Sequence, residues 1–187
     1  MPYLFLIFML CSISMPAKAI SKFVHCFDFG CKSVIEIEYS ENQWRVIKSL
    51  FTTTQNNFEE KQSIRKAIAL MERFSGQLTG THRDKGGNYP GYDLEKQLDC
   101  IDESTNTLQY LRALEDFELL QWHRVVPKQR RIVWFISHWT AVIEEIESGQ
   151  RFAVDSWHRD NGEPPILQPM KDWQKGRDFP SDLNPDT

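Results

Sequence analysis

The sequence predicts one α+β domain in which N-terminal helices pack on an antiparallel β-sheet. The chain has 187 residues, of which 41% are hydrophobic, and this is enough to form a single core. Segments with helical periodicity come first, and most segments with strand-like patterns follow them. We place the domain at residues 20–178, after a leader at 1–19 and before a tail at 179–187 that we expect to be frayed.

The leader has the features of a secretory signal peptide. Leu4 to Leu10 form an apolar run that is too short to span a membrane, and Ala17-Lys18-Ala19 supplies the small-x-small pattern of a cleavage site. Because no Lys or Arg precedes the run, an uncleaved anchor is the alternative. Cleavage after Ala19 predicts an exported protein, periplasmic or secreted, with no stable membrane span.

Three cysteines follow the leader. Cys26 and Cys31 flank a short loop in which Gly30 can adopt a positive φ, and in an oxidising compartment they would form a disulfide. The alternatives are two buried thiols, or a metal site with His25 that lacks a fourth ligand nearby. Cys100 is then the odd cysteine, and it is either an intermolecular link or a free reactive thiol.

The first regular segments lie before residue 75. Residues 33–39 alternate between apolar and polar side chains, which predicts a strand with Ile35, Ile37 and Tyr39 on its buried face. Apolar residues at helical spacing predict one helix over 44–51 and a longer one over 58–74. For the longer helix, Asn57 with Glu60 offers an N-terminal cap and Gly76 offers a stop. The next segment, 76–97, is rich in glycine, and we predict a long functional loop there.

A third helix is predicted to begin near Cys100, with Asp99 as its N-terminal cap. Strand-like segments follow at residues 120–126, 132–143 and 151–157, and Ser148-Gly149 marks the turn before the last of them. These segments complete the antiparallel sheet.

Charge and motifs exclude several classes of function. The chain has 22 basic and 26 acidic residues, a net charge of -4, and no run of five like charges. Binding to nucleic acid or to an anionic membrane requires clustered Lys and Arg, so neither is expected. No phosphate-binding loop or paired metal motif is present, so we predict no metal or organic cofactor.

Cys100, His138 and Asp155 supply a nucleophile, a base and an orienting carboxylate. A thiol at a helix N-terminus is stabilised as the thiolate by the helix dipole, and the free N–H groups there can hold an oxyanion. A histidine within reach moves the proton, and a carboxylate on its other nitrogen fixes the tautomer. Asp102 and Glu103 lie near the thiol, and their negative charges would oppose thiolate formation.

The spacing of His138 and Asp155 fits one face of a hairpin. The two residues are 17 positions apart, so their side chains share a face if the loop between the strands has an even length. A four-residue loop at 145–148 would place them directly opposite each other.

Other polar and aromatic residues near this pattern have two interpretations. Gln97 could donate its amide to an oxyanion hole, although we favour a solvated loop residue. Trp139 and Trp157 could form walls of a cleft, although aromatic core is the more common role. We interpret the remaining histidines as structural or surface residues: His82, His123 and His158.

The order and context of these residues resemble the transglutaminase-like branch of the papain-like superfamily. The resemblance covers residues 95–160 and includes Asp99-Cys100-Ile101-Asp102 opening a helix, His138-Trp139-Thr140-Ala141-Val142 and Ala153-Val154-Asp155-Ser156-Trp157. It implies a transglutaminase-like fold and a cysteine hydrolase or acyltransferase that acts on amide bonds of a protein or peptide through a thioester. The alternatives are a catalytically silent binding module in the same cleft and a structural envelope protein.

Overall fold

The computed structural model describes residues 22–88, 95–133 and 135–177. The predicted leader, tail and part of the glycine-rich loop lie outside these ranges. No helix within them is long and apolar enough to cross a membrane. The elements in chain order are β1 (Lys22–Phe27), β2 (Ser33–Glu38), α1 (Glu41–Ser49), α2 (Asn57–Thr79), α3 (Cys100–Asp116), β3 (His123–Val133), β4 (Ile136–Glu145), β5 (Arg151–Asp155), β6 (Ile166–Pro169) and α4 (Met170–Trp173).

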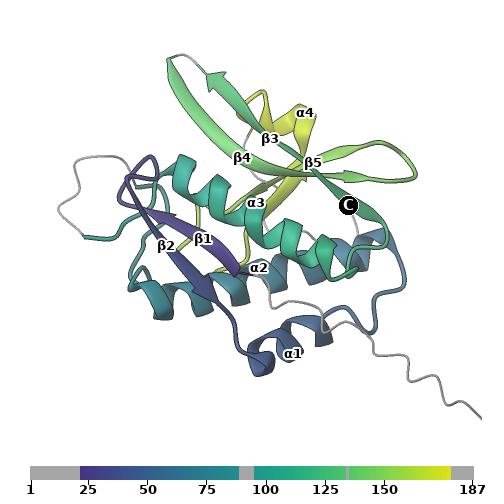
Figure 1. Cartoon of the computed structure of the whole chain (residues 1–187). Helices are drawn as coiled ribbons and strands as arrows, with labels where there is room; N and C mark the ends of the chain where they lie inside the picture. Colours follow the sequence, from purple (N-terminus) through teal and green to yellow (C-terminus); the bar gives the residue numbers. More distant parts are fainter. Residues whose placement is uncertain (1–21, 89–94, 134, 178–187) are drawn as a thin grey trace, which may run out of the picture.

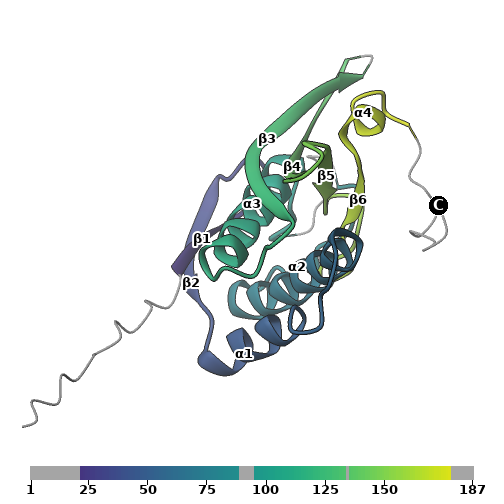
Figure 2. The same ribbon diagram turned by 90° about the vertical axis from the view of Figure 1, so that its right-hand side faces the viewer.

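The elements form an α+β architecture, as predicted. The four-stranded sheet has the order β3-β4-β5-β6, and all its neighbouring strands are antiparallel. Helix α3 lies between this sheet and the antiparallel pair β1-β2, and α2 packs beside α3 (Figure 1). The long helices α2 and α3 lie on one side of the four-stranded sheet, and the short α4 follows β6 at its end (Figure 2).

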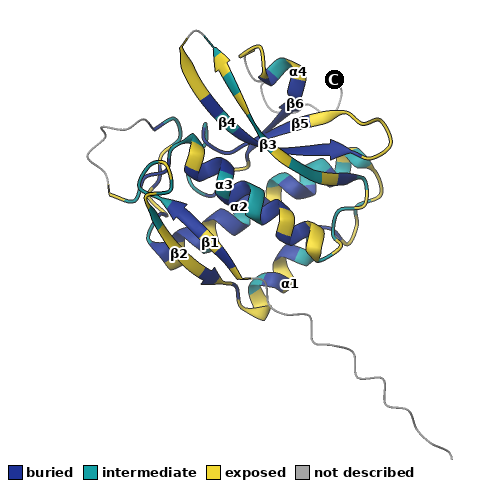
Figure 3. Ribbon diagram, turned by 45° about the horizontal axis from the view of Figure 1, so that its top comes forward, coloured by how far each residue is buried: buried dark blue, intermediate teal, exposed yellow. Residues whose placement is uncertain are grey.

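Apolar residues on both faces of the four-stranded sheet are buried. Ala141 and Ile143 of β4 belong to the large core shared with α2 and α3, whereas Val142 packs with Trp173 of α4. The inward sides of α2 and α3 and the central strands are the buried parts of the fold (Figure 3). Because side chains alternate along a strand, His138 shares the face of Val142.

Helix α2 begins earlier and ends later than predicted. Its N-cap is Asn56, whose side chain accepts the Glu59 N–H, so the predicted cap of Asn57 with Glu60 is wrong. The helix continues through Gly76 and ends at Gly80, which has φ of 85°. Gly76 is needed for packing, because a Cβ there would lie 2.7 Å from Asn161 Oδ1.

Glu60 has a tertiary role in place of capping. Its buried carboxylate accepts the backbone N–H groups of Gln121, Trp122 and His123, and it lies 2.8 Å from His123 Nδ1. His123 is therefore a structural residue, as predicted, and Glu60 fixes the connection that enters β3.

Two predicted strand boundaries are wrong. The strand predicted over 120–126 continues in β3 past Pro127 to Val133, and the strand predicted over 132–143 is divided between β3 and β4, which begins at Ile136. A register shift between Val126 and Gln129 accommodates the proline, and β3 is an edge strand, where a missing N–H is tolerated. The apolar run at 132–136 contains no Gly, Asn or Asp, so the sequence gives no signal that separates two strands there.

The N-terminal strand pair carries the predicted disulfide. β2 has nearly the predicted bounds and pairs with β1, which the sequence reasoning missed. Ile37 is buried, but Ile35 is 41% exposed, because only two strands form this sheet. Cys26 and Cys31 are bonded, with their Cα atoms 4.7 Å apart, and Gly30 has the expected positive φ of 71°.

Candidate active site

The predicted histidine and aspartate meet between β4 and β5. His138 Nε2 lies 2.7 Å from Asp155 Oδ2, and both side chains are buried. This contact leaves Nδ1 as the ring nitrogen that can serve another partner. The sequence prediction that the two side chains share one face is confirmed.

Their register differs from the predicted direct pairing. Ala141 faces Val154, and continuing this register sets Asp155 opposite Thr140, two positions from His138. The predicted loop at 145–148 is too short, since the residues between the last strand pairs are 145–150. The predicted and the observed loops both have an even number of residues, so the side chains of His138 and Asp155 still lie on the same face of the sheet. The imidazole contacts the carboxylate diagonally across the two strands.

Asp155 is held as a carboxylate by donors. Its Oδ2 also lies 2.8 Å from Trp173 Nε1, and His158 Nε2 is 3.9 Å away. Burial opposes the charged form, but the hydrogen bond and the charge of His138 outweigh it and lower the pKa of Asp155. The result is a fixed negative charge beside the imidazole.

Cys100 is partly exposed and shares a cavity of about 420 Å³ with His138. Burial lowers the pKa of His138, but hydrogen bonds to Asp155 and Cys100 and the charges of these groups raise it to about 9. The histidine is therefore an imidazolium at neutral pH, placed between a carboxylate and a sulfur. Trp157 also lines the cavity, and its ring centroid lies 4.9 Å from that of His138, so this tryptophan is a cleft wall.

The N-terminus of α3 presents Cys100 as predicted. Asp99 caps the helix, and its carboxylate accepts the N–H groups of Ile101 and Asp102. Its carbonyl accepts the N–H of Glu103. Of these first-turn N–H groups, the Cys100 N–H alone has no acceptor within the described residues, so it is the donor left for an oxyanion.

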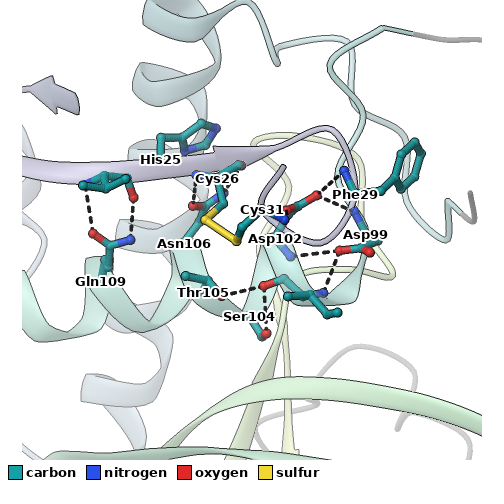
Figure 4. Close-up of a disulfide and its surroundings, with 12 residues drawn as sticks. His25, Cys26, Phe29, Cys31, Asp99, Asp102, Ser104, Thr105, Asn106 and Gln109 are labelled. Atoms are coloured by element: carbon teal, nitrogen blue, oxygen red, sulfur yellow. Dashed lines mark hydrogen bonds between the residues drawn. A yellow bond between two sulfur atoms is a disulfide. The ribbon is translucent and has the colours of Figure 1, made fainter. Parts of the chain in front are cut away.

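Asp102 connects this helix turn to the disulfide loop. Its carboxylate accepts the backbone N–H groups of Phe29 at 2.9 Å and Cys31 at 2.5 Å, and that of Asp99 at 3.2 Å (Figure 4). Figure 4 shows the loop lying over the start of α3, with the Cys26–Cys31 bond beside Asn106. The charge of Asp102 is thus directed toward the loop amides.

Glu103 does not oppose the thiolate as the sequence suggested. It is buried, and desolvation together with the nearby carboxylates of Glu72 and Asp84 raises its pKa well above the usual range. Burial also raises the pKa of Glu72 to about 8 and that of Asp84 to about 7. Glu103 is therefore neutral at pH 7, and Asp84 is one of its hydrogen-bond partners.

Gln97 lies away from the cavity and is not solvated. Its side chain is 1% exposed, accepts the Lys85 N–H at 3.1 Å, and donates to the Arg83 carbonyl at 3.3 Å. It also accepts a hydrogen bond from Asn88, whose carbonyl in turn accepts the Trp157 indole N–H. Gln97 therefore holds the glycine-rich loop against the site.

Sequence reasoning missed other residues of the site. His158 lines the cavity instead of the outer surface, and its ring centroid lies 5.3 Å from that of His138. Its position next to Trp157 was a weak signal. Trp173 is fully buried and bonds to Asp155 from a four-residue helix, and Arg131 lines the cavity from an edge strand. Neither residue belongs to a motif, so only the fold reveals it.

In the described residues, two clusters of side chains contain atoms that could bind a metal ion. The ligand atoms of His138, Asp155 and His158 lie within 4.8 Å of one another, as do those of Cys26, Cys31 and Asp102. The second group is committed to a disulfide, and in the first Asp155 Oδ2 already accepts two hydrogen bonds. The arrangement fits proton transfer at His138.

Comparisons with protein-family models, with curated proteins and with solved structures found no match for this chain. The functional conclusion therefore depends on the site itself.

Proposed function

We propose that this protein is a cysteine-dependent hydrolase or acyltransferase of transglutaminase-like type that acts on amide bonds of peptides or proteins. The observation that carries this proposal is that His138, which is hydrogen-bonded to the Asp155 carboxylate, lines the same cavity as Cys100. The order of a cysteine at a helix start, a histidine strand and an aspartate strand supports the same class. Fold analogy alone would not define a function.

The reaction would proceed in two steps. Cys100 Sγ, as the thiolate paired with the His138 imidazolium, attacks the amide carbonyl carbon, and the Cys100 N–H stabilises the resulting oxyanion. The C–N bond then breaks as His138 gives its proton to the departing amine, which leaves a thioester. His138 next removes a proton from water or from an acceptor amine, which attacks the thioester carbonyl carbon. The C–S bond then breaks, which releases the acid or a new amide and restores the thiolate beside the His138 imidazolium.

The test is turnover of peptide and glutamine amides by the full chain and by Cys100→Ala. We expect release of ammonia or amine by the wild type, a thioester adduct in its intact mass, and a loss of more than about 10³-fold in the variant. Product mass with and without an added primary amine distinguishes hydrolysis from transfer. A wild type that forms no adduct and turns over no amide would contradict the enzyme proposal and favour the binding module or the structural protein.

We further propose that the protein is exported. The Cys26–Cys31 disulfide supports an oxidising compartment, and the leader supplies a route to it. Intact-mass analysis of protein from the cell envelope should show a chain that starts at Ile20, with one disulfide and one alkylatable thiol. Three free thiols would contradict this proposal.

A further inference from the structure

Arg131 lies next to the candidate catalytic histidine. It pairs with His138 in the β3-β4 register, and side chains at paired positions point to the same face with Cβ atoms about 5 Å apart. Both residues line the cavity that contains Cys100. A group bound by Arg131 is therefore close to the reacting atoms.

Trp173 holds the Arg131 guanidinium in a fixed orientation. One of its terminal nitrogens donates to the Trp173 carbonyl, and its centre lies 4.6 Å from the Trp173 ring centroid. Within the described part of the chain it forms no ion pair, and its remaining N–H groups have no acceptor. Burial lowers the pKa of Arg131 and the charge of Asp155 opposes this shift, but no ion pair joins these two residues, and Asp155 Oδ2 is hydrogen-bonded to His138 and Trp173.

The surroundings make this cation unusual. Of the described residues that line the cavity, Arg131 alone is an arginine or lysine, and its neighbours include Val133, Ile136 and Trp139. A half-buried guanidinium among apolar groups gains most from an anion that accepts two parallel hydrogen bonds, and a carboxylate has that geometry. The cavity therefore combines an acyl-transfer centre, apolar walls and one carboxylate-binding group.

We propose that Arg131 is a specificity residue that binds a carboxylate of the substrate, so that the enzyme prefers amides with a carboxylate close to the scissile bond. This inference rests on the proposed function. The carboxylate is either the C-terminal α-carboxylate of a peptide or an acidic side chain, and both present the same fork of oxygens to the guanidinium.

The experiment compares matched peptides. One pair differs only in a C-terminal carboxylate against a C-terminal amide, and the other differs only in Glu against Gln beside the scissile bond. We expect the wild type to prefer the acidic member of one pair by roughly 10- to 100-fold in kcat/KM. Arg131→Gln should remove this preference by raising KM for the acidic peptide, with little change for its neutral partner, and Arg131→Lys should retain part of it.

Arg112→Gln is the matched control, because Arg112 is an exposed arginine on α3 that does not line the cavity. It should keep the wild-type preference. Equal rates for both members of each pair in the wild type would overturn the inference. So would an Arg131→Gln variant that loses kcat equally on acidic and neutral peptides, since that result indicates a structural role through Trp173.

Peptide-binding measurements distinguish failure of the proposed enzyme function from failure of the inference about Arg131. If no peptide is turned over, affinity for the same four peptides is measured with Cys100→Ser and with Cys100→Ser/Arg131→Gln. Tighter binding of an acidic peptide that depends on Arg131 supports the inference even without catalysis. Equal binding of acidic and neutral peptides overturns it.

Discussion

His138 receives its chemical character from two neighbours on different elements. Asp155 on β5 holds Nε2, Cys100 at the start of α3 acts on the same ring, and together they raise the histidine pKa to about 9. An ordinary histidine has a pKa of about 6.5 and is mostly neutral at pH 7. The site therefore stores a proton beside the sulfur at neutral pH.

The position of Cys100 at a helix N-terminus, in the cavity that it shares with His138, predicts a reactive thiol. At pH 6 a free cysteine is almost entirely protonated, and a neighbouring imidazolium together with the helix dipole favours the reactive thiolate form of a cysteine. We expect iodoacetamide to alkylate Cys100 at pH 6 at least about 10-fold faster than free cysteine, and His138→Ala to remove the advantage. The exposed His82 provides the control, and His82→Ala should react like the wild type. Ordinary reactivity in the wild type would favour a silent relative.

Asp155 is predicted to act as a positioning residue through His138. Asp155→Asn removes the negative charge, so the His138 pKa, followed by NMR titration, should fall from about 9 toward about 6.5. Amide turnover should fall by about 10²- to 10⁴-fold because the tautomer is no longer fixed. Trp173→Phe removes one donor to the same carboxylate and should have a smaller effect. An unchanged His138 pKa in Asp155→Asn would refute this role.

At the scale of elements, the start of α3 is fixed by contacts from distant segments. Asp99 caps the helix through a local contact with the first turn. Asp102, in contrast, accepts hydrogen bonds from the backbone of the disulfide loop, which lies about 70 residues earlier in the chain. Asp28 in that loop also accepts the Lys96 N–H and donates its own N–H to the Gln97 carbonyl. The loop therefore holds both sides of Cys100.

Removal of the disulfide should weaken the fold and the site together. The double variant Cys26→Ser/Cys31→Ser should lose about 2 kcal/mol of unfolding free energy in urea titrations, the value that the chain-entropy model gives for so short a loop. Because the loop holds the α3 N-terminus, Cys100 alkylation at pH 6 should also slow. A dithiol reductant should reproduce both effects in the wild type and neither in the variant. Full reactivity with reduced stability would separate the loop from the site.

At the scale of the whole molecule, the helical layer contains buried acids whose pKa is raised. Burial raises the pKa of Glu72 on α2, of Glu103 on α3 and of Asp84 in the glycine-rich loop. In contrast, the pKa of Asp155 is lowered by its hydrogen bond to His138 and by the charge of that residue. Packing thus decides which acids are charged.

These groups predict that stability falls as pH rises from 7 to 9. The folded state holds protons on His138, with a pKa of about 9, and on Glu72, with a pKa of about 8, whereas the unfolded chain has released them at about 6.5 and 4.3. The unfolded state binds fewer protons, so the unfolding free energy decreases, by about 3 to 4 kcal/mol for these two pKa shifts together. His25, with a pKa lowered to about 4, is neutral in both states here and does not contribute.

Urea titrations at pH 7, 8 and 9 measure this slope. Glu72→Gln keeps the neutral shape of the side chain and should flatten the curve near pH 8, and His138→Gln should flatten it near pH 9. Glu41→Gln, on the exposed start of α1, is the control and should leave the slope unchanged. Stability that rises over this range would contradict the buried protons.

The sequence by itself determined the local parts of this protein. The Asp99 cap and the apolar stripe placed α3, the Cys26–Cys31 spacing gave the disulfide, and the odd separation of His138 and Asp155 gave their common face. The cap and the disulfide depend on residues that are close in the chain, and the common face depends on whether the number of residues between two strand positions is odd or even. Both kinds of information can be read directly from the sequence.

Only the tertiary structure decided the register and the surroundings of the site. The connection at 145–150 is two residues longer than predicted, which shifts the β4-β5 register. In β3, a register shift between Val126 and Gln129 accommodates Pro127, and no local sequence pattern predicts this shift. Trp173, Arg131 and the proton on Glu103 depend on contacts between elements far apart in the chain. Burial and long-range pairing set these features, and a linear pattern contains neither.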